Sequence, residues 1–124
     1  YSHIYYQDQQ RVIDLAVTLS IRNTAADQSI QIDAVQYYDS AGQFVRSYIA
    51  EPMRLGALAS TAFVVEEEDV SGGVGASFIV AWSSAQQITA PVIEAVMISA
   101  ASTQGISFVS VGRVLEEYPI VTKE

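Results

Sequence analysis

The chain has 124 residues, the length of one ordinary domain, and half of them are hydrophobic, so a single core can support the fold. Fourteen acidic residues against six basic ones give a formal net charge of −8, which repels nucleic acid and anionic lipid at long range and disfavours both as partners. The lack of cysteine excludes disulfides and thiolate sites, and no apolar run approaches the roughly 20 residues that span a bilayer.

Two strands are predicted before residue 24. The first covers residues 1–6. The second is long and covers Arg11–Asn23, where the odd-numbered positions from 13 to 21 are Ile, Leu, Val, Leu and Ile. An apolar residue at every second position is typical of a β-strand with one buried face.

The next segment repeats this rhythm of turn and strand. Residues 23–28 are small and polar and favour a turn. A strand follows, with apolar side chains at positions 30, 32, 35 and 37. The change of parity after Ile32 predicts a β-bulge around Asp33–Ala34, although a strand buried on both faces would show a similar pattern.

A hairpin turn is predicted at Asp39–Gly42, because Asp caps turns with its side chain and glycine accepts a positive φ. The returning strand covers Phe44–Ile49 and ends before Pro52, which has no backbone donor for a ladder. A further extended segment, Thr61–Val65, leads into the acidic run Glu66–Asp69.

Three strands are predicted after the glycine-rich turn Ser71–Gly75. The strand at 78–82 carries apolar residues on both faces, which predicts a place at the centre of a sheet. Pro91–Ser99 also fits helical spacing, but its β-branched residues favour a strand. The last strand is Ile106–Val114.

Seven to eight strands with polar turns predict an all-β fold, an antiparallel two-sheet sandwich of immunoglobulin-like kind. A closed antiparallel barrel is the alternative, because strand count and alternation do not separate the two. No repeat or linker divides the chain, so residues 1–124 are predicted to form a single domain, with 115–124 as an edge extension or tail.

Short motifs follow one another along most of the chain in a fixed order. They are Tyr1–Tyr5, Leu19–Asn23, Tyr37–Asp39, the Ser71–Gly73 turn with Gly75, Ala76 and Phe78, and Gly105–Phe108 leading to Gly112 and Arg113. As an ordered set they resemble an uncharacterised bacterial family, the domain of unknown function 3124. Before Phe78 the family has Asn, whereas this chain has Ser77.

The resemblance implies a small β-domain that is exported into the bacterial cell envelope, periplasmic or extracellular, and sometimes lipid-anchored. The chain begins at Tyr1 rather than methionine, so a signal peptide or a lipid anchor upstream of Tyr1 is left open. The resemblance implies no activity, because the family has no assigned function.

The sequence offers little catalytic chemistry, and no catalytic residue is predicted. The single histidine, His3, would need a serine and a carboxylate for a hydrolytic triad, and no Gly-x-Ser-x-Gly motif is present. The candidates would be Ser2, Ser20, Ser107 and Asp39. Paired carboxylates could in principle catalyse glycoside hydrolysis, but the isolated acids are expected to be solvated. These acids are Asp14, Asp33 and Glu94.

The acidic run is a weak candidate for a calcium site, because hard cations prefer clustered oxygens. Its residues are Glu66, Glu67, Glu68 and Asp69. The run lacks the spacing of an EF-hand loop, and a solubilising strand end is the more common role of such a run. No cofactor is predicted.

Tyrosine pairs and glycines are weak candidates for a binding surface. They are Tyr5, Tyr6, Tyr37, Tyr38, Gly72, Gly73 and Gly75. Neighbouring residues of a strand point to opposite faces, so at least one tyrosine of each pair is expected to face outward, where tyrosine supplies broad contact area.

Together these features favour a non-enzymatic binding or structural module of the bacterial cell envelope. Its partner would be a protein or a glycan, and homo-oligomerisation is left open. The alternative function is a carboxylate-dependent hydrolase or a calcium-dependent carbohydrate-binding domain, which the acidic excess and the aromatic residues motivate.

Overall fold

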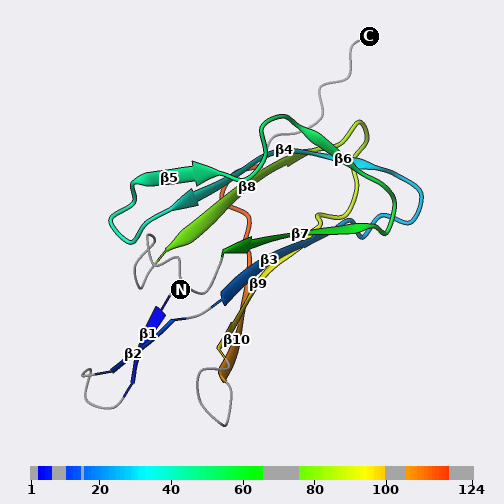
Figure 1. Ribbon diagram of the computed structural model, residues 1–124. Coiled ribbons are helices and arrows are strands. Elements are labelled where there is room, and N and C mark those ends of the chain that lie inside the picture. Colours follow the sequence, from blue (N-terminus) through cyan, green and yellow to red (C-terminus); the bar gives the residue numbers. More distant parts are fainter. Residues whose placement is uncertain (1–2, 7–10, 15, 66–75, 100–105, 118–124) are drawn as a thin grey trace.

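The computed structural model describes residues 3–6, 11–14, 16–65, 76–99 and 106–117 (Figure 1). These residues form ten antiparallel strands and contain no helix. The strands are β1 (His3–Tyr6), β2 (Arg11–Asp14), β3 (Ala16–Arg22), β4 (Ile30–Tyr38), β5 (Phe44–Ser47), β6 (Met53–Leu55), β7 (Ser60–Val65), β8 (Ser77–Ser83), β9 (Val92–Ser99) and β10 (Ile106–Val111).

Eight of these strands form two four-stranded sheets, which lie one above the other in Figure 1. The β3 sheet has the order β10-β9-β3-β7. In the β4 sheet, β8 pairs with one edge of β4, and β5 and β6 share the other edge. Strands β1 and β2 form a separate two-stranded sheet. The predicted two-sheet sandwich is confirmed.

The chain alternates between the two sheets as in an immunoglobulin-like core. β3 and β4 belong to different sheets, β7 returns to pair with β3, and β8 returns to pair with β4. Strands B, C, E and F of immunoglobulin domains alternate in this way. The next strand departs from that pattern, because β9 pairs with β3 rather than with β8.

This departure makes the prediction for residues 78–82 wrong. Within the described residues, β8 pairs with β4 alone and is an edge strand, while β4 is central. The inward face of β8 carries Phe78, Val80 and Trp82, and Ile79 on the outward face is 41% exposed. Apolar residues on both faces are therefore no sign of a central position here.

The predicted strand over Arg11–Asn23 corresponds to β2 and β3, and Leu15 between them lies outside the described residues. β2 pairs with β1, whereas β3 pairs with β7 and β9, so the segment contributes to two different sheets. The period-two pattern is the same in both halves, and such a pattern specifies which face is apolar but not which partner strand pairs with it.

The core forms where the inward faces of β3 and β4 meet. Its buried residues are Val17, Leu19, Ile21, Ile30, Ile32, Val35, Tyr37, Leu55, Val65 and Met97. In β4 the buried positions change parity after Ile32, and the pairing with β8 shifts register between Ile32 and Ala34. The predicted β-bulge is confirmed, and it keeps both halves of β4 facing the core.

Four aromatic rings join the two sheets at the core. The Tyr37 ring lies 5.0 Å from that of Phe78 and 6.2 Å from that of Tyr48, measured between centroids. The Tyr48 ring in turn lies 6.2 Å from that of Phe63 in the opposite sheet. Tilted and edge-on rings at these distances attract each other beyond their area burial.

The predicted turn at Asp39–Gly42 is confirmed. The Asp39 carboxylate accepts hydrogen bonds from the backbone N–H groups of Ala41 and Gln43, both at 2.9 Å. Gly42 has a φ of +81°, a conformation that favours glycine. The strand over Pro91–Ser99 is confirmed as β9.

Gly112 fixes the end of β10 against β9. Its N–H donates a 2.7 Å hydrogen bond to the Ile93 carbonyl oxygen, and a Cβ added at Gly112 would lie 3.0 Å from that same oxygen. A side chain at position 112 would therefore crowd the Ile93 carbonyl oxygen that accepts this hydrogen bond.

We expect Gly112→Ala to lower the free energy of unfolding by about 1–3 kcal/mol, as in other overpacked sites. Gly56→Ala is the matched control, because a Cβ there meets nothing within 4 Å, and it should be neutral or slightly stabilising. Urea denaturation of the two variants tests this, and equal stabilities would contradict it.

Candidate functional site

One end of the sandwich is organised around the side chain of Asn23, which is fully buried. Its Nδ2 donates to the carbonyl oxygens of Gln28 at 2.7 Å, Gly56 at 3.1 Å and Leu55 at 3.3 Å. Its Oδ1 accepts from the N–H of Ala25 at 2.9 Å. A single amide thus satisfies backbone groups of the β3–β4 loop and of the segment after β6.

Further hydrogen bonds tie a third loop to this end. The Thr24 hydroxyl donates to the Ala90 carbonyl oxygen at 3.2 Å, and the Leu58 N–H donates to the Ala25 carbonyl oxygen at 3.1 Å. The loops 23–29, 56–59 and 84–91 therefore meet at one end, which lies on the right in Figure 1. Clustered end loops on a rigid sandwich are a common place for binding residues.

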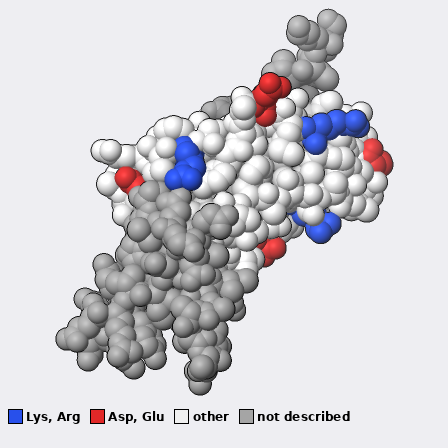
Figure 2. All heavy atoms as spheres, in the orientation of Figure 1, with Lys and Arg blue, Asp and Glu red and all other residues white. Residues whose placement is uncertain are grey.

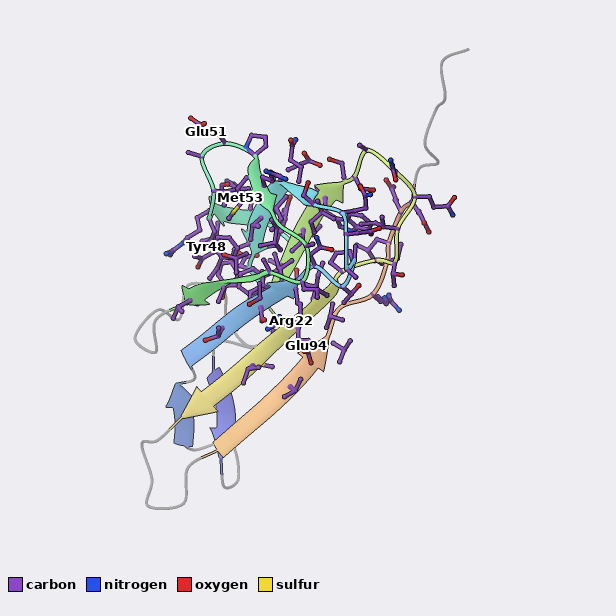
Figure 3. The ribbon with its side chains drawn as sticks, turned by 90° about the vertical axis from the view of Figure 1, so that its right-hand side faces the viewer. Arg22, Tyr48, Glu51, Met53 and Glu94 are labelled. Carbon is purple, nitrogen blue, oxygen red and sulfur yellow. The ribbon has the colours of Figure 1, made fainter. Side chains whose placement is uncertain are left out.

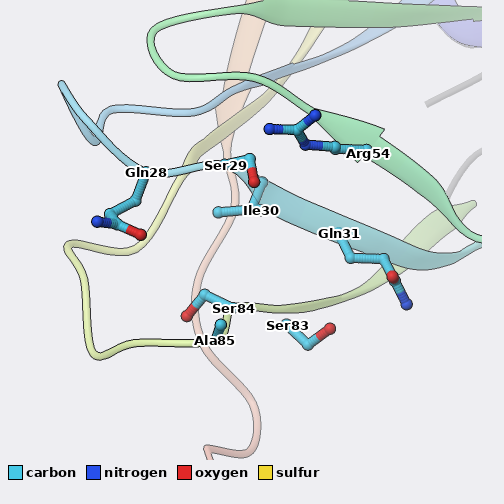
Figure 4. Close-up of a pocket in the computed structure, with 8 residues that line it drawn as sticks. All are labelled: Gln28, Ser29, Ile30, Gln31, Arg54, Ser83, Ser84 and Ala85. Carbon is cyan, nitrogen blue, oxygen red and sulfur yellow. The ribbon is translucent and has the colours of Figure 1, made fainter.

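A polar pocket of about 390 Å³ opens at this loop end (Figure 4). It lies between the start of β4, the middle of β6 and the residues that follow β8. Its lining residues are Gln28, Ser29, Ile30, Gln31, Arg54, Ser83, Ser84 and Ala85.

Most of the residues that line this pocket are polar. Amides and hydroxyls donate and accept hydrogen bonds, and Arg54 adds a planar guanidinium that suits carboxylates. None of the lining residues is His, Asp or Glu. The pocket can therefore orient a small polar group, but its described lining contains no acid-base pair.

The outer face of the β3 sheet combines exposed valines with polar side chains, which include Thr18, Ser20 and Arg22 of β3 itself. Val17, Leu19 and Ile21 of β3 point inward, so the intervening residues of β3 and their direct partners on neighbouring strands point outward. Five valines share this outer side, and we call it the valine face. They are Val64 on β7, Val92 and Val96 on β9, and Val109 and Val111 on β10.

Four of these valines are strongly exposed to solvent. The exposed fractions are 51% for Val64, 42% for Val92, 61% for Val109 and 70% for Val111. Val109 lies directly opposite Val96 and Val111 opposite Glu94 in the ladder. The β9 and β10 valines lie on adjacent strands, whereas Val64 on β7 is separated from them by the polar outward residues of β3. A group of exposed branched side chains on two adjacent strands differs from the single exposed apolar residues that are normal on a protein surface.

Two charged residues, Arg22 and Glu94, also lie on the valine face. Arg22 pairs with Val92 and Glu94 pairs with Ser20, so the two charges stand diagonally on neighbouring strands (Figure 3). The Arg22 guanidinium donates to the Leu58 carbonyl oxygen at 2.9 Å and to Ser60 Oγ at 3.4 Å. Its position at the end of the face is thereby held in place.

Leu58, which holds Arg22, has a strained backbone. Its φ is +57°, which costs about 1–2 kcal/mol for a residue with a side chain. The Leu58 N–H and C=O are both bonded, to Ala25 and Arg22, so the surrounding loops keep it in this conformation. Its side chain is 55% exposed. Strain of this kind tends to occur at functional surfaces.

The opposite face of the sandwich has a different character. The outward side of β4 carries Gln31, Gln36 and Tyr38, and Gln31 lies opposite Arg54 of β6. Figure 2 views the molecule in the orientation of Figure 1, with the two sheets one above the other, and there the charged side chains of the described residues stand singly among uncharged ones. The outer side of the β4 sheet also carries two exposed apolar residues, Phe44 on β5 and Ile79 on β8.

Comparison with known families gives one match. The profile of the family described as Protein of unknown function (DUF3124) matches residues 1–115. The chain belongs to this family. Searches of curated proteins and of solved structures gave no significant match.

The structure of this DUF3124 chain describes the side chains of only two of the four tyrosines predicted to form a binding surface. Tyr37 is 1% exposed and belongs to the core, whereas Tyr38 points outward, with its ring 5.8 Å from that of Phe44. Tyr5 and Tyr6 lie on β1, opposite Val12 and Arg11, and their side chains lie outside the described part. One tyrosine of the 37–38 pair faces outward, as expected.

The other predicted binding residues lie outside the described residues. They are the acidic run Glu66, Glu67, Glu68 and Asp69 and the glycines Gly72, Gly73 and Gly75. Among the residues that are described, no group of three His, Cys, Asp or Glu side chains could hold a metal ion. The calcium hypothesis for the acidic run therefore stays a prediction.

The residues considered for a triad are widely distributed. His3 lies on β1 opposite Asp14, Ser20 lies on the outer side of β3, and Asp39 caps the turn after β4. Ser2 is outside the described residues, and Ser107 lies on β10. The structure thus places Ser20 and Asp39 on different sheets.

The remaining carboxylates considered for glycoside chemistry are also separated. Asp33 accepts a 2.7 Å hydrogen bond from Gln31 Nε2 at the bulge of β4, whereas Glu94 lies on β9 of the other sheet.

In the ranges covered by the structure, no helix is long and apolar enough to cross a membrane.

Sequence reasoning missed the two main features of this region. Asn23 reads as a turn residue, and only its contacts reveal a buried link between loops. The valine face could have been found from parity, since Val109 and Val111 alternate with serine at 110. That pattern does not show which face of the strand packs against the other sheet and which faces solvent.

We expect Asn23→Ala to lower the free energy of unfolding by about 3 kcal/mol, because several buried backbone groups lose their partner. Asn23→Asp should be worse, since a carboxylate would face three carbonyl oxygens. Gln87→Ala, an exposed amide in the 84–91 loop, is the control and should change stability by less than about 0.5 kcal/mol. Chemical denaturation measures all three, and a mild effect of Asn23→Ala would contradict the linking role.

Proposed function

We propose that this chain is a non-enzymatic binding module of the bacterial cell envelope and that its partner is a protein that docks on the valine face. The observation that carries this proposal is the set of exposed valines on β7, β9 and β10 of the β3 sheet. Exposed apolar patches are uncommon on monomers and often mark interaction surfaces.

The dimensions of the valine face support a reversible complex. Four strands spaced about 4.8 Å apart and seven residues of about 3.4 Å each give a face of roughly 460 Å². That is about half of the roughly 800 Å² that each partner contributes to a standard stable interface. A partner on this face would bind and dissociate readily unless it also reached the end loops.

The two charges of the valine face supply specificity. Arg22 is held by Leu58 at one end of the face, and Glu94 lies on the neighbouring strand. A partner with an apolar centre and a carboxylate opposite Arg22 would match this arrangement, because charged residues at an interface mainly select partners and orient them.

The polar pocket supports binding rather than reaction chemistry at the loop end. Its hydroxyls, amides and Arg54 offer hydrogen bonds to a partner loop that reaches past the valine face. Support for the envelope comes from the family resemblance, which implies export. Fractionation of cells that carry the natural gene tests this part, and recovery of the protein only in the cytoplasmic fraction would refute it.

Val109→Lys and Val64→Lys should each weaken capture of the envelope partner by roughly tenfold or more, because a lysine in an apolar contact costs at least about 1.4 kcal/mol. Phe44→Lys is the matched control, since Phe44 is an exposed apolar residue at 55% on the other sheet, and it should retain binding. The measurement is crosslinking in envelope extract, followed by titration of the captured protein.

The folded state of each variant is checked by circular dichroism. Equal capture by the wild type and both valine variants would refute the proposed docking face, whatever protein is recovered.

A further inference from the structure

Strand β8 presents an edge that no described strand covers. It pairs with β4 over its whole length, from Ser77 opposite Tyr38 to Ser83 opposite Gln31. In the ranges that the structure describes, no strand lies on its other side. The backbone N–H and C=O groups along such an edge form a template for another strand.

The β8 edge lacks the charges that usually block strand pairing. Residues 70–93 contain no charged side chain, whereas β5 carries Arg46, β6 carries Arg54, and Arg113 follows β10. Strand β7 runs directly into the acidic run at 66–69. Two copies of a chain with net charge −8 repel each other, so an uncharged edge is where they approach with least repulsion.

The sequence of β8 is complementary to itself. When two copies run antiparallel about Val80, Phe78 lies opposite Trp82, Ile79 opposite Ala81 and Ser77 opposite Ser83. Each residue of one copy then faces one of similar chemistry in the other, and aromatic residues face each other on the inward side. This arrangement has a two-fold axis, the symmetry of most protein dimers.

The inward-facing side chains of β8 are only partly removed from solvent. Phe78, Val80 and Trp82 pack against the buried core but are themselves only half-buried. They are the outermost inward-facing residues of the β4 sheet on that side. A second β8 would cover them, and removing this apolar surface from water favours association.

We propose that β8 pairs antiparallel with β8 of a second copy of this chain, centred on Val80, so that two β4 sheets join into one continuous sheet. This pairing uses the edge of the β4 sheet and leaves both valine faces open. It is independent of the function proposed above, and either one can fail without the other.

Cysteine crosslinking tests the register directly, because the natural chain has no cysteine. Ser77→Cys and Ser83→Cys are prepared as separate proteins, both at exposed positions. In the proposed register these two residues lie opposite each other, at a Cα separation that allows a disulfide. Two copies of residue 77 would be about 20 Å apart.

Oxidation of the mixed proteins should therefore give a dimer band, and oxidation of either protein alone should not. A dimer band that is equally strong with Ser77→Cys alone would overturn the antiparallel register. Absence of a band in the mixture, with both proteins folded, would overturn the pairing itself.

Sedimentation of the full chain over a range of concentrations provides the second measurement. The wild type should pass from monomer to dimer, and Ile79→Lys should remain a monomer, because Ile79 faces outward next to the axis and lysine blocks edge pairing. Val109→Lys, on the valine face, is the control and should dimerise like the wild type. A wild type that stays monomeric throughout, or an Ile79→Lys variant that dimerises unchanged, would overturn the proposal.

Discussion

The sandwich depends on how the chain is held as it crosses from one sheet to the other, and the buried amide of Asn23 provides that constraint. Asn23 follows β3 directly, and its side chain bonds to the carbonyl oxygens of Gln28, Leu55 and Gly56. A buried amide that is fully bonded holds its neighbours in one arrangement, because each lost bond would leave a polar group without water. The loop end, the polar pocket and the placement of Arg22 through Leu58 all follow from this crossing.

The two outer faces of the sandwich have different chemistry although their inner faces share one core. The valine face presents exposed valines from β7, β9 and β10 beside polar residues of β3, whereas the outward side of the β4 sheet presents amides together with Tyr38, Phe44 and Ile79. Such asymmetry has no role in the stability of the core, because these side chains point away from it.

The pairing of β9 explains why β8 lies at the edge of its sheet. Because β9 pairs with β3 instead of β8, the β3 sheet gains a strand and β8 is left at the margin of the β4 sheet. An immunoglobulin-like arrangement would place a strand beside β8. The uncharged, apolar sequence that made β8 resemble a central strand thus lies at an edge, and this conflict between sequence and position is itself an indication that something pairs there.

The sequence alone determined the β-strands, their inward faces and the local turns, because period-two alternation, the bulge at Ile32–Ala34 and the Asp39 turn are set by neighbouring residues. Which strands pair with one another was decided only by the tertiary structure. The pairing of β3 with β7 and β9, the edge position of β8 and the buried state of Asn23 depend on segments distant along the chain. The candidate surfaces follow the same division, since alternation assigns Val109 and Val111 to one side, and only the packing of the two sheets leaves that side open to solvent.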